Sequence, residues 1–113
     1  MIFLRALLGQ GFKSVSIEDY RESIQKSDHV LVDVRSPGEY HRGHVSRAVN
    51  IPLGDLDSRL GEIPRDKPVV VICESGSRSR MGAATLAEHG FRDVHDLRGG
   101  TGLWASRGLP LKR

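Results

Sequence analysis

Residues 68–79 read PVVVICESGSRS, an apolar run followed by a short polar loop and the start of a helical pattern. The run at 68–72 is short, rich in β-branched residues and free of charge, which predicts a strand buried on both faces of a sheet. The alanine-rich stretch 78–89 predicts a helix, and Gly90 suits its C-terminal end. A buried strand that leads into a helix is typical of a parallel sheet covered by helices, so this stretch indicates the fold class.

The same alternation of strands and helices continues on both sides of this stretch. Ser16 precedes an apolar pattern with acidic residues in its first turn, and Ser36 precedes a proline, and both are typical helix starts. The expected strands cover 14–16, 29–34, 45–51, 68–72 and 94–97. The expected helices cover 17–24, 37–41, 53–60, 78–89 and a final turn around Trp104. The pattern predicts an α/β domain with a mostly parallel sheet and helices on both faces.

Length and composition predict one ordinary domain. The chain has 113 residues, of which 38% are hydrophobic, and a chain of this size can bury a core. We assign residues 13–113 to the domain and residues 1–12, an apolar patch with a glycine-containing end, to a short N-terminal extension. No stretch reaches the roughly 20 apolar residues that a membrane span needs. Residues 1–12 also lack the features of a secretion signal.

The net charge and the cysteine content argue against several function classes. The formal charge is +3 without a basic run or a zinc-ligand pattern, so we expect no nucleic acid partner. A single cysteine forms no internal disulfide and no cysteine-rich metal cluster. We therefore expect no bound metal and a reducing compartment, the cytoplasm.

The cysteine, Cys73, stands at the end of the predicted buried strand, directly before the loop and the helix. Unpaired N–H groups at a helix start favour an anion in front of them, and a tight loop through Gly76 can turn further N–H groups towards the same point. If the sulfur occupies that point, its thiolate form is stabilised, and a thiolate is a nucleophile. The alternative is a small buried side chain that ends a core strand, as most free cysteines are.

Charge and spacing in the loop refine this prediction. A cation in the first turn of a helix opposes the helix dipole, so we expect Arg78 to contact an anionic substrate or the thiolate. A carboxylate beside a thiolate opposes its ionisation, so we expect Glu74 to point to solvent. Four residues separate Cys73 from Arg78, whereas cysteine-dependent phosphatases have five, with Ser79 here at the position of their arginine. The smaller loop favours a cradle for one extra sulfur atom over one for a phosphoryl group.

Three ordered motifs resemble those of the single-domain rhodaneses, a family of sulfurtransferases. They are LVDVRSPGEYHRGHVSRAVNIPL at 31–53, VVVICESGSRS at 69–79 and GFRDVHDLRGGTGLWASRGLP at 90–110. The resemblance implies an α/β domain with a five-stranded sheet, a cysteine that carries sulfane sulfur as a persulfide, and no cofactor. It also implies a small sulfur-containing anion such as thiosulfate as the donor, and cyanide, a thiol or a protein as the acceptor.

The resemblance implies roles for particular residues. Cys73 matches the catalytic cysteine, and the backbone N–H groups of the residues that follow it match the cradle that holds the persulfide. These residues are Glu74, Ser75, Gly76, Ser77 and Arg78. The Arg78 side chain would orient the anionic donor, and Arg35 is a further candidate for positive charge near the site. The other polar residues of the first motif, among them Asp33 and Glu39, are expected to form a structural network.

Two alternatives stay open beside a thiosulfate sulfurtransferase. A rhodanese-like domain can dock a partner while its cysteine is idle or senses redox state, and the apolar segment 1–12 is compatible with docking. A cysteine-dependent phosphatase or arsenate reductase would use the same scaffold, but the four-residue spacing disfavours it. We therefore expect an enzyme that uses Cys73 for sulfur transfer.

Overall fold

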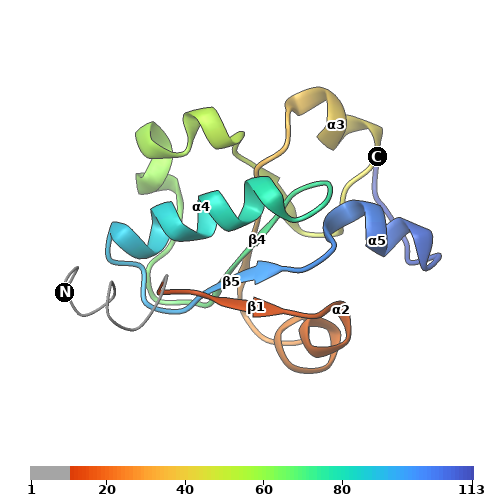
Figure 1. The fold of residues 1–113 in the computed structure, drawn as a ribbon, viewed down its shortest axis with the longest axis horizontal. Coiled ribbons are helices and arrows are strands. Elements are labelled where there is room, and N and C mark those ends of the chain that lie inside the picture. The colour runs from red at the N-terminus through yellow and green to blue at the C-terminus, as the bar shows by residue number, and fades with distance from the viewer. Residues whose placement is uncertain (1–10) are drawn as a thin grey trace.

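The centre of the molecule is a five-stranded sheet, and all its strands are parallel. The computed structural model describes residues 11–113 (Figure 1). The strands lie in the order β1-β5-β4-β2-β3, and every neighbouring pair is parallel. They are β1 (Lys13–Val15), β2 (Val30–Asp33), β3 (Ala48–Asn50), β4 (Val69–Ile72) and β5 (Val94–Leu97). The predicted α/β class is confirmed, and the extended stretch predicted at 45–51 is reduced to β3.

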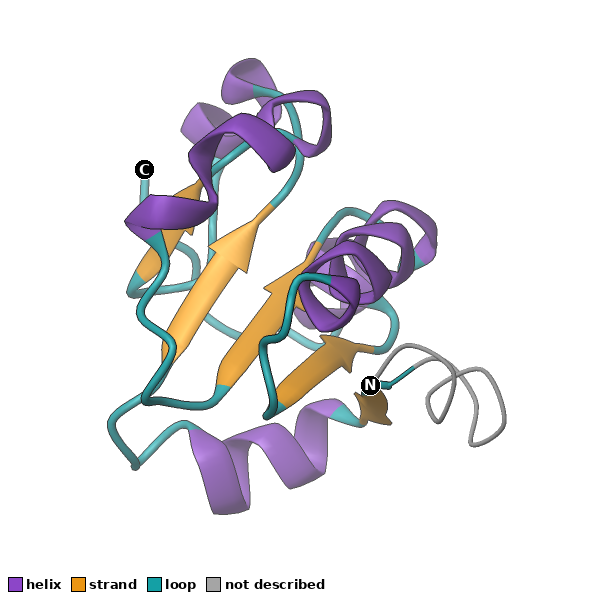
Figure 2. Ribbon diagram, turned by 90° about the vertical axis from the view of Figure 1, so that its left-hand side faces the viewer, coloured by secondary structure: helices purple, strands orange, loops and turns teal. Residues whose placement is uncertain are grey.

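Helices cover both faces of this sheet (Figure 2). They are α2 (Ile17–Asp19), the π-helix η1 (Tyr20–Ile24), α3 (Pro37–Arg42), the 3-10 segments η2 (Leu53–Asp55) and η3 (Asp57–Glu62), α4 (Ser77–Glu88) and α5 (Gly100–Ser106). Each face has its own apolar core, because successive side chains of a strand point to opposite faces. Val71 packs in one core with Leu86 of α4, and Val70 packs in the other with Trp104 of α5.

The helix predicted at 53–60 is wrong as a single α-helix. The chain instead forms the two 3-10 segments η2 and η3, and Arg59 leaves helical geometry with φ −120° and ψ 18°. Leu53 and Leu56 are three residues apart, a spacing that a 3-10 turn places on one side, and both contact the same core. Gly54 between them further weakens the α-helical alternative.

The helix starts predicted at Ser16 and Ser36 are confirmed. The Ser16 hydroxyl accepts a hydrogen bond from the Asp19 N–H at 3.0 Å. Ser36 and Glu39 form a capping box, in which each side chain accepts a hydrogen bond from the backbone N–H of the other, at 3.2 and 3.0 Å. The box holds the Glu39 carboxylate at the first turn of α3.

The predicted extension at 1–12 lies almost wholly outside the described residues. Phe12 is described, and it packs, partly buried, against the core that contains Leu86. Within residues 11–113, no helix combines the length and the apolar character that crossing a bilayer requires.

The carboxyl ends of the strands position the candidate site. Parallel strands end at one edge of a sheet, and ligands of open α/β folds bind beyond that edge. Cys73 directly follows β4, which lies between β5 and β2. Gly100, with φ +60°, lies so close that a Cβ on it would come 2.3 Å from the Cys73 carbonyl oxygen. The Thr101 N–H donates to the same oxygen at 2.8 Å, so the start of α5 is seated directly against the loop after β4.

Candidate active site

Cys73 lies at the end of β4 with 0% of its surface exposed. Its Sγ accepts a hydrogen bond from the Gly76 N–H at 3.0 Å. Gly76 has φ +113°, in the left-handed region that favours glycine, and precedes the first residue of α4. No side chain caps this end of α4. The sulfur therefore lies at the positive end of a twelve-residue helix, as the sequence predicts.

The backbone N–H groups expected to form a cradle belong to the loop after β4 and to the start of α4. In the described part of the chain, the Gly76 amide is the one backbone donor that reaches Sγ. The side chains of Glu74, Ser75 and Ser77 lie at the exposed surface of the loop. The sulfur itself is buried beneath this loop.

A second polar contact to the sulfur comes from Ser79, for which the sequence predicts no role. Its Oγ lies 3.5 Å from the Sγ of Cys73 and is fully buried. The Ser79 hydroxyl has one proton, which it can donate either to the Gly76 carbonyl at 3.1 Å or to the Oδ1 of Asp96. Asp96, on β5, is 1% exposed, and its Oδ2 accepts from the Ser14 hydroxyl at 3.2 Å.

Sequence reasoning missed this pair because its members are 17 residues apart and come from different elements. One signal was available. In the strand VHDL, Asp96 lies between His95 and Leu97, and a carboxylate within a strand of a covered sheet requires polar partners.

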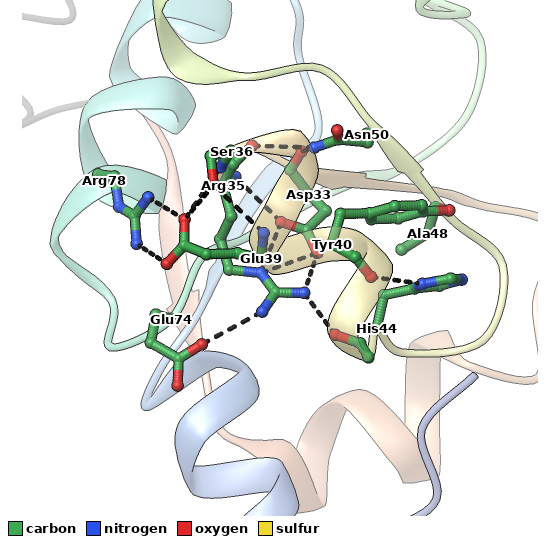
Figure 3. Close-up of polar contacts among 11 residues, drawn as sticks. Asp33, Arg35, Ser36, Glu39, Tyr40, His44, Ala48, Asn50, Glu74 and Arg78 are labelled. Atoms are coloured by element: carbon green, nitrogen blue, oxygen red, sulfur yellow. Dashed lines mark hydrogen bonds and ion pairs between the residues drawn. The ribbon is translucent and has the colours of Figure 1, made fainter. Parts of the chain in front are cut away.

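Arg78 is joined to helix α3 by a two-point contact with Glu39 (Figure 3). Its two terminal nitrogens donate to the two carboxylate oxygens at 2.8 and 2.9 Å. The hydrogen bonds from Arg78 lower the pKa of Glu39 to about 2. The same contact, together with the nearby Cys73 side chain, raises the pKa of Arg78. From the sequence we expect Arg78 to face a substrate or the thiolate and Glu39 to lie in a structural network, and the local pattern does not connect the two.

Arg35 ties the other flank of the loop to β2 (Figure 3). It is 3% exposed and donates to Asp33 through Nε at 3.0 Å and Nη2 at 2.8 Å, and to the Gly43 carbonyl at 2.7 Å. Its Nη1 forms an ion pair with Glu74 at 3.2 Å. Burial opposes the charge of Arg35, but the hydrogen bonds with Asp33 outweigh it and raise the pKa of Arg35.

Glu74 is exposed, as expected, and it also has a cationic partner. Its side chain is half-exposed at 48%, but it is paired with Arg35 instead of standing free in solvent. A guanidinium beside the carboxylate offsets its negative charge, so Glu74 opposes a neighbouring thiolate less than an isolated carboxylate would. The positive charge of Arg35 is shared between Asp33 and Glu74.

Two pockets flank the loop. One, of about 290 Å³, is lined by residues of α3, the loop and α5, among them Arg35, Arg42, Glu74 and Thr101. The Thr101 hydroxyl there is buried and has no hydrogen-bond partner among the described residues. The other, of about 230 Å³, lies on the opposite flank and is lined by Ser75, Gly76, Ser77, Arg80, Asp96, Arg98 and Gly99. Within residues 11–113, no three His, Cys, Asp or Glu side chains gather in a way that could hold a metal ion.

Comparison with known proteins places this geometry in a family context. A family model described as "Rhodanese-like domain" matches residues 16–107. A sulfurtransferase of Allochromatium vinosum is 42% identical over 84 residues, which is 74% of this chain and 78% of that protein. Thiosulfate sulfurtransferase GlpE of Pseudoalteromonas translucida is 32% identical over 82% of this chain and 89% of its own length. The crystal structure of a rhodanese-related protein from Thermoplasma volcanium is 31% identical with a TM-score of 0.81, over 89% of this chain and 98% of that one.

Proposed function

The chain belongs to the rhodanese-like domain family, and from that premise we propose that it transfers sulfane sulfur from thiosulfate or a similar anion to a thiophilic acceptor through a persulfide on Cys73. Relatives at 32–42% identity that are named sulfurtransferases support sulfurtransferase activity in general. The observation that carries the finer proposal is the position of Cys73, whose Sγ accepts a hydrogen bond from Gly76 at the start of α4.

The first half-reaction loads the cysteine. The Cys73 thiolate attacks the outer sulfur of thiosulfate, a new S–S bond forms, and the old S–S bond breaks with its electron pair leaving on sulfite. The product is a Cys73 persulfide. The Gly76 N–H and the positive end of α4 favour the anionic sulfur before and after this step.

The second half-reaction returns the enzyme to its starting state. A nucleophile, either cyanide, a small thiolate or a protein thiolate, attacks the outer sulfur of the persulfide. The bond between the two sulfurs breaks, and its electron pair stays on Cys73 as the thiolate. No electrons are gained or lost from outside, so the cycle uses the cysteine alone as the carrier.

Of the two arginines that the resemblance implies, Arg78 is the better placed to attract the donor. Its side chain is 37% exposed, whereas Arg35 is buried in its ion pairs. The Glu39 contact fixes the guanidinium at the rim of the loop and leaves part of it open to solvent. We propose that Arg78 orients the anionic end of the donor.

Because a lone free cysteine suits a reducing compartment, we place this reaction in the cytoplasm.

Mass spectrometry tests the proposal directly. Incubation of the protein with thiosulfate is expected to add the mass of one sulfur atom, which cyanide or a reductant then removes. The Cys73→Ser variant is expected to gain no such mass, and Ser58→Ala, an exposed serine of η3, serves as the matched control. An unmodified wild-type protein contradicts the proposal. Turnover of an aryl phosphate that depends on Cys73 would favour the phosphatase alternative.

A further inference from the structure

A continuous chain of polar contacts leads from the cysteine into the sheet. The Cys73 thiol is within 3.5 Å of the Ser79 Oγ and can donate its proton to that oxygen. The Ser79 hydroxyl can in turn donate to the Oδ1 of Asp96, and the Gly76 carbonyl at 3.1 Å is the alternative acceptor. All three side chains are buried, at 0%, 0% and 1% exposed. Bulk water therefore does not compete for these contacts.

Asp96 is suited to accept a proton. Its carboxylate is buried, and among the described residues it has hydroxyl partners, Ser79 and Ser14, but no ion pair with a cation. A buried carboxylate without a cation is unfavourable in its charged form. Uptake of one proton removes that charge. The hydrogen bond between the two side chains is kept, with Asp96 now donating to the Ser79 oxygen.

We propose that Ser79 is a catalytic residue that relays the proton of Cys73 to Asp96, which acts through Ser79 as a positioning residue. The step moves two protons. The S–H bond breaks and leaves its electron pair on sulfur, the Ser79 oxygen takes this proton, and the former Ser79 proton passes to the Oδ1 of Asp96. The Ser79 hydroxyl then donates to the thiolate, and the protonated Asp96 donates to Ser79. The thiolate gains a second donor besides the Gly76 N–H, and the reverse transfer restores the thiol.

This inference deepens the proposed function, because it rests on Cys73 as the nucleophile of sulfur transfer. Other charged groups also face the two ends of the relay. Arg78 of α4 and Glu74 of the loop lie near Cys73. Arg80 of α4 and Arg98 after β5 share a pocket with Asp96. On the neighbouring strand β1, Lys13 is one register position from the partner of Asp96, and β4 carries no charge.

The test follows formation of the Cys73 thiolate with pH. The readout is the ultraviolet absorbance of the thiolate in the full chain, with the spectrum of Cys73→Ser subtracted. Ser79→Ala and Asp96→Asn are each expected to raise the pH midpoint by about one unit or more. The double variant is expected to match either single variant, because both break one chain. The controls Ser58→Ala and Asp93→Asn, both exposed, are expected to leave the midpoint in place.

The direction in which Asp96→Asn shifts the pH midpoint of thiolate formation shows whether Asp96 accepts the proton or stays charged beside Cys73. A carboxylate that stays charged beside Cys73 disfavours the thiolate, so its removal would lower the midpoint. A carboxyl that holds the proton is neutral and donates through Ser79 towards the thiolate, so loss of this O–H donor raises the midpoint. An unchanged or lowered midpoint in a folded Asp96→Asn protein overturns the proposal.

Ser14→Ala provides a second variant that does not disturb the interior, because Ser14 is exposed on β1. Its hydroxyl stabilises the charged form of Asp96, so its loss makes Asp96 a stronger proton acceptor. The thiolate midpoint is expected to fall, opposite to Ser79→Ala, and a rise or no change contradicts the role of Asp96.

None of these titrations contains a sulfur donor. Failure of wild-type protein to gain sulfur from thiosulfate would overturn the proposed function and leave the relay result standing.

Discussion

The guanidinium of Arg78 lies in a two-point contact with the carboxylate of Glu39, which joins the loop after β4 to the first turn of α3. The two residues are 39 positions apart in the chain. On the other flank of the loop, Arg35 pairs with Glu74 across the same number of residues. The loop that carries Cys73 is therefore held at both ends by ion pairs with the segment that follows β2.

The Glu39 contact predicts a loss of stability in acid. The pKa of Glu39 is lowered from 4.5 to about 2 in the folded protein, so its stabilising effect is complete above pH 4.5 and is lost as the pH falls towards 2. Because Arg78 is 37% exposed, we discount for solvent screening and expect about 1 kcal/mol. Urea unfolding at neutral pH and at the lowest pH at which the protein stays folded measures this difference in the free energy of unfolding. Glu39→Gln should remove most of this pH dependence, and an unchanged acid slope would contradict the assignment.

Arg78→Ala is expected to lower kcat/KM for thiosulfate by roughly 10- to 100-fold, because a hydrogen bond to a charged group contributes about 1.5–3 kcal/mol. Steady-state kinetics with cyanide as acceptor measures the effect, and it should appear mainly in KM for the donor. Arg92→Ala, at an exposed position before β5, is the matched control. If both variants behave alike, Arg78 has no specific role in donor binding.

Glu39→Gln offers a complementary kinetic test. The variant frees the Arg78 guanidinium from a carboxylate that competes with an anionic donor. We expect a lower KM for thiosulfate in Glu39→Gln, opposite to Arg78→Ala. A KM that rises in both variants would mean that Glu39 holds Arg78 in its working position, and that orientation outweighs competition.

Gly100→Ala is expected to distort the site. A Cβ at this position would lie 2.3 Å from the Cys73 carbonyl oxygen, and φ is +60°. Because the obstacle is backbone, the loop or α5 must move, at a cost of about 1–3 kcal/mol for the strained conformation and the displaced contacts. Thermal unfolding and the persulfide assay measure the two consequences. Gly61→Ala, where a Cβ meets nothing within 4 Å, is the control, and equal stability of the two variants would refute the expectation.

Tyr20 predicts a loss of stability in alkali. Burial raises its pKa to about 12 from 10.0, so the folded state keeps the proton that the unfolded chain releases. Its stabilising effect is complete below pH 10.0 and declines as the pH rises towards about 12. In Tyr20→Phe this decline should be smaller. The variant also loses the 2.9 Å contact with His29, which should destabilise it by about 1–3 kcal/mol. The free energy of unfolding of both proteins, measured at neutral and at alkaline pH, gives the loss of stability in alkali and the cost of the lost His29 contact. Tyrosinate absorbance follows the ionisation of Tyr20.

Local sequence patterns predicted most of the elements correctly. Apolar β-branched runs placed the strands at 29–34 and 68–72, and shorter stretches placed those at 14–16 and 94–97, each to within about two residues. Ser16 and Ser36 marked two helix starts, because a helix cap depends on residues that are neighbours in the chain. The same local reasoning was wrong at 53–60. There, packing of Leu53 and Leu56 on one core selects a 3-10 geometry that apolar periodicity does not distinguish from an α-helix.

The candidate nucleophile could be proposed from the sequence, since strand, glycine and helix start all lie within a few residues of Cys73. The partners of its loop could not. Glu39 meets Arg78, and Ser79 meets Asp96, only because the order β1-β5-β4-β2-β3 brings the ends of β2, β4 and β5 to one edge. Hydrogen bonds and ion pairs act over a few ångströms of space, and their partners do not recur at a regular spacing in the sequence as the apolar residues of strands and helices do. The position of Cys73 between a strand and a helix start therefore follows from the local sequence. Which charged groups and hydroxyls surround it is determined by the packing of the sheet.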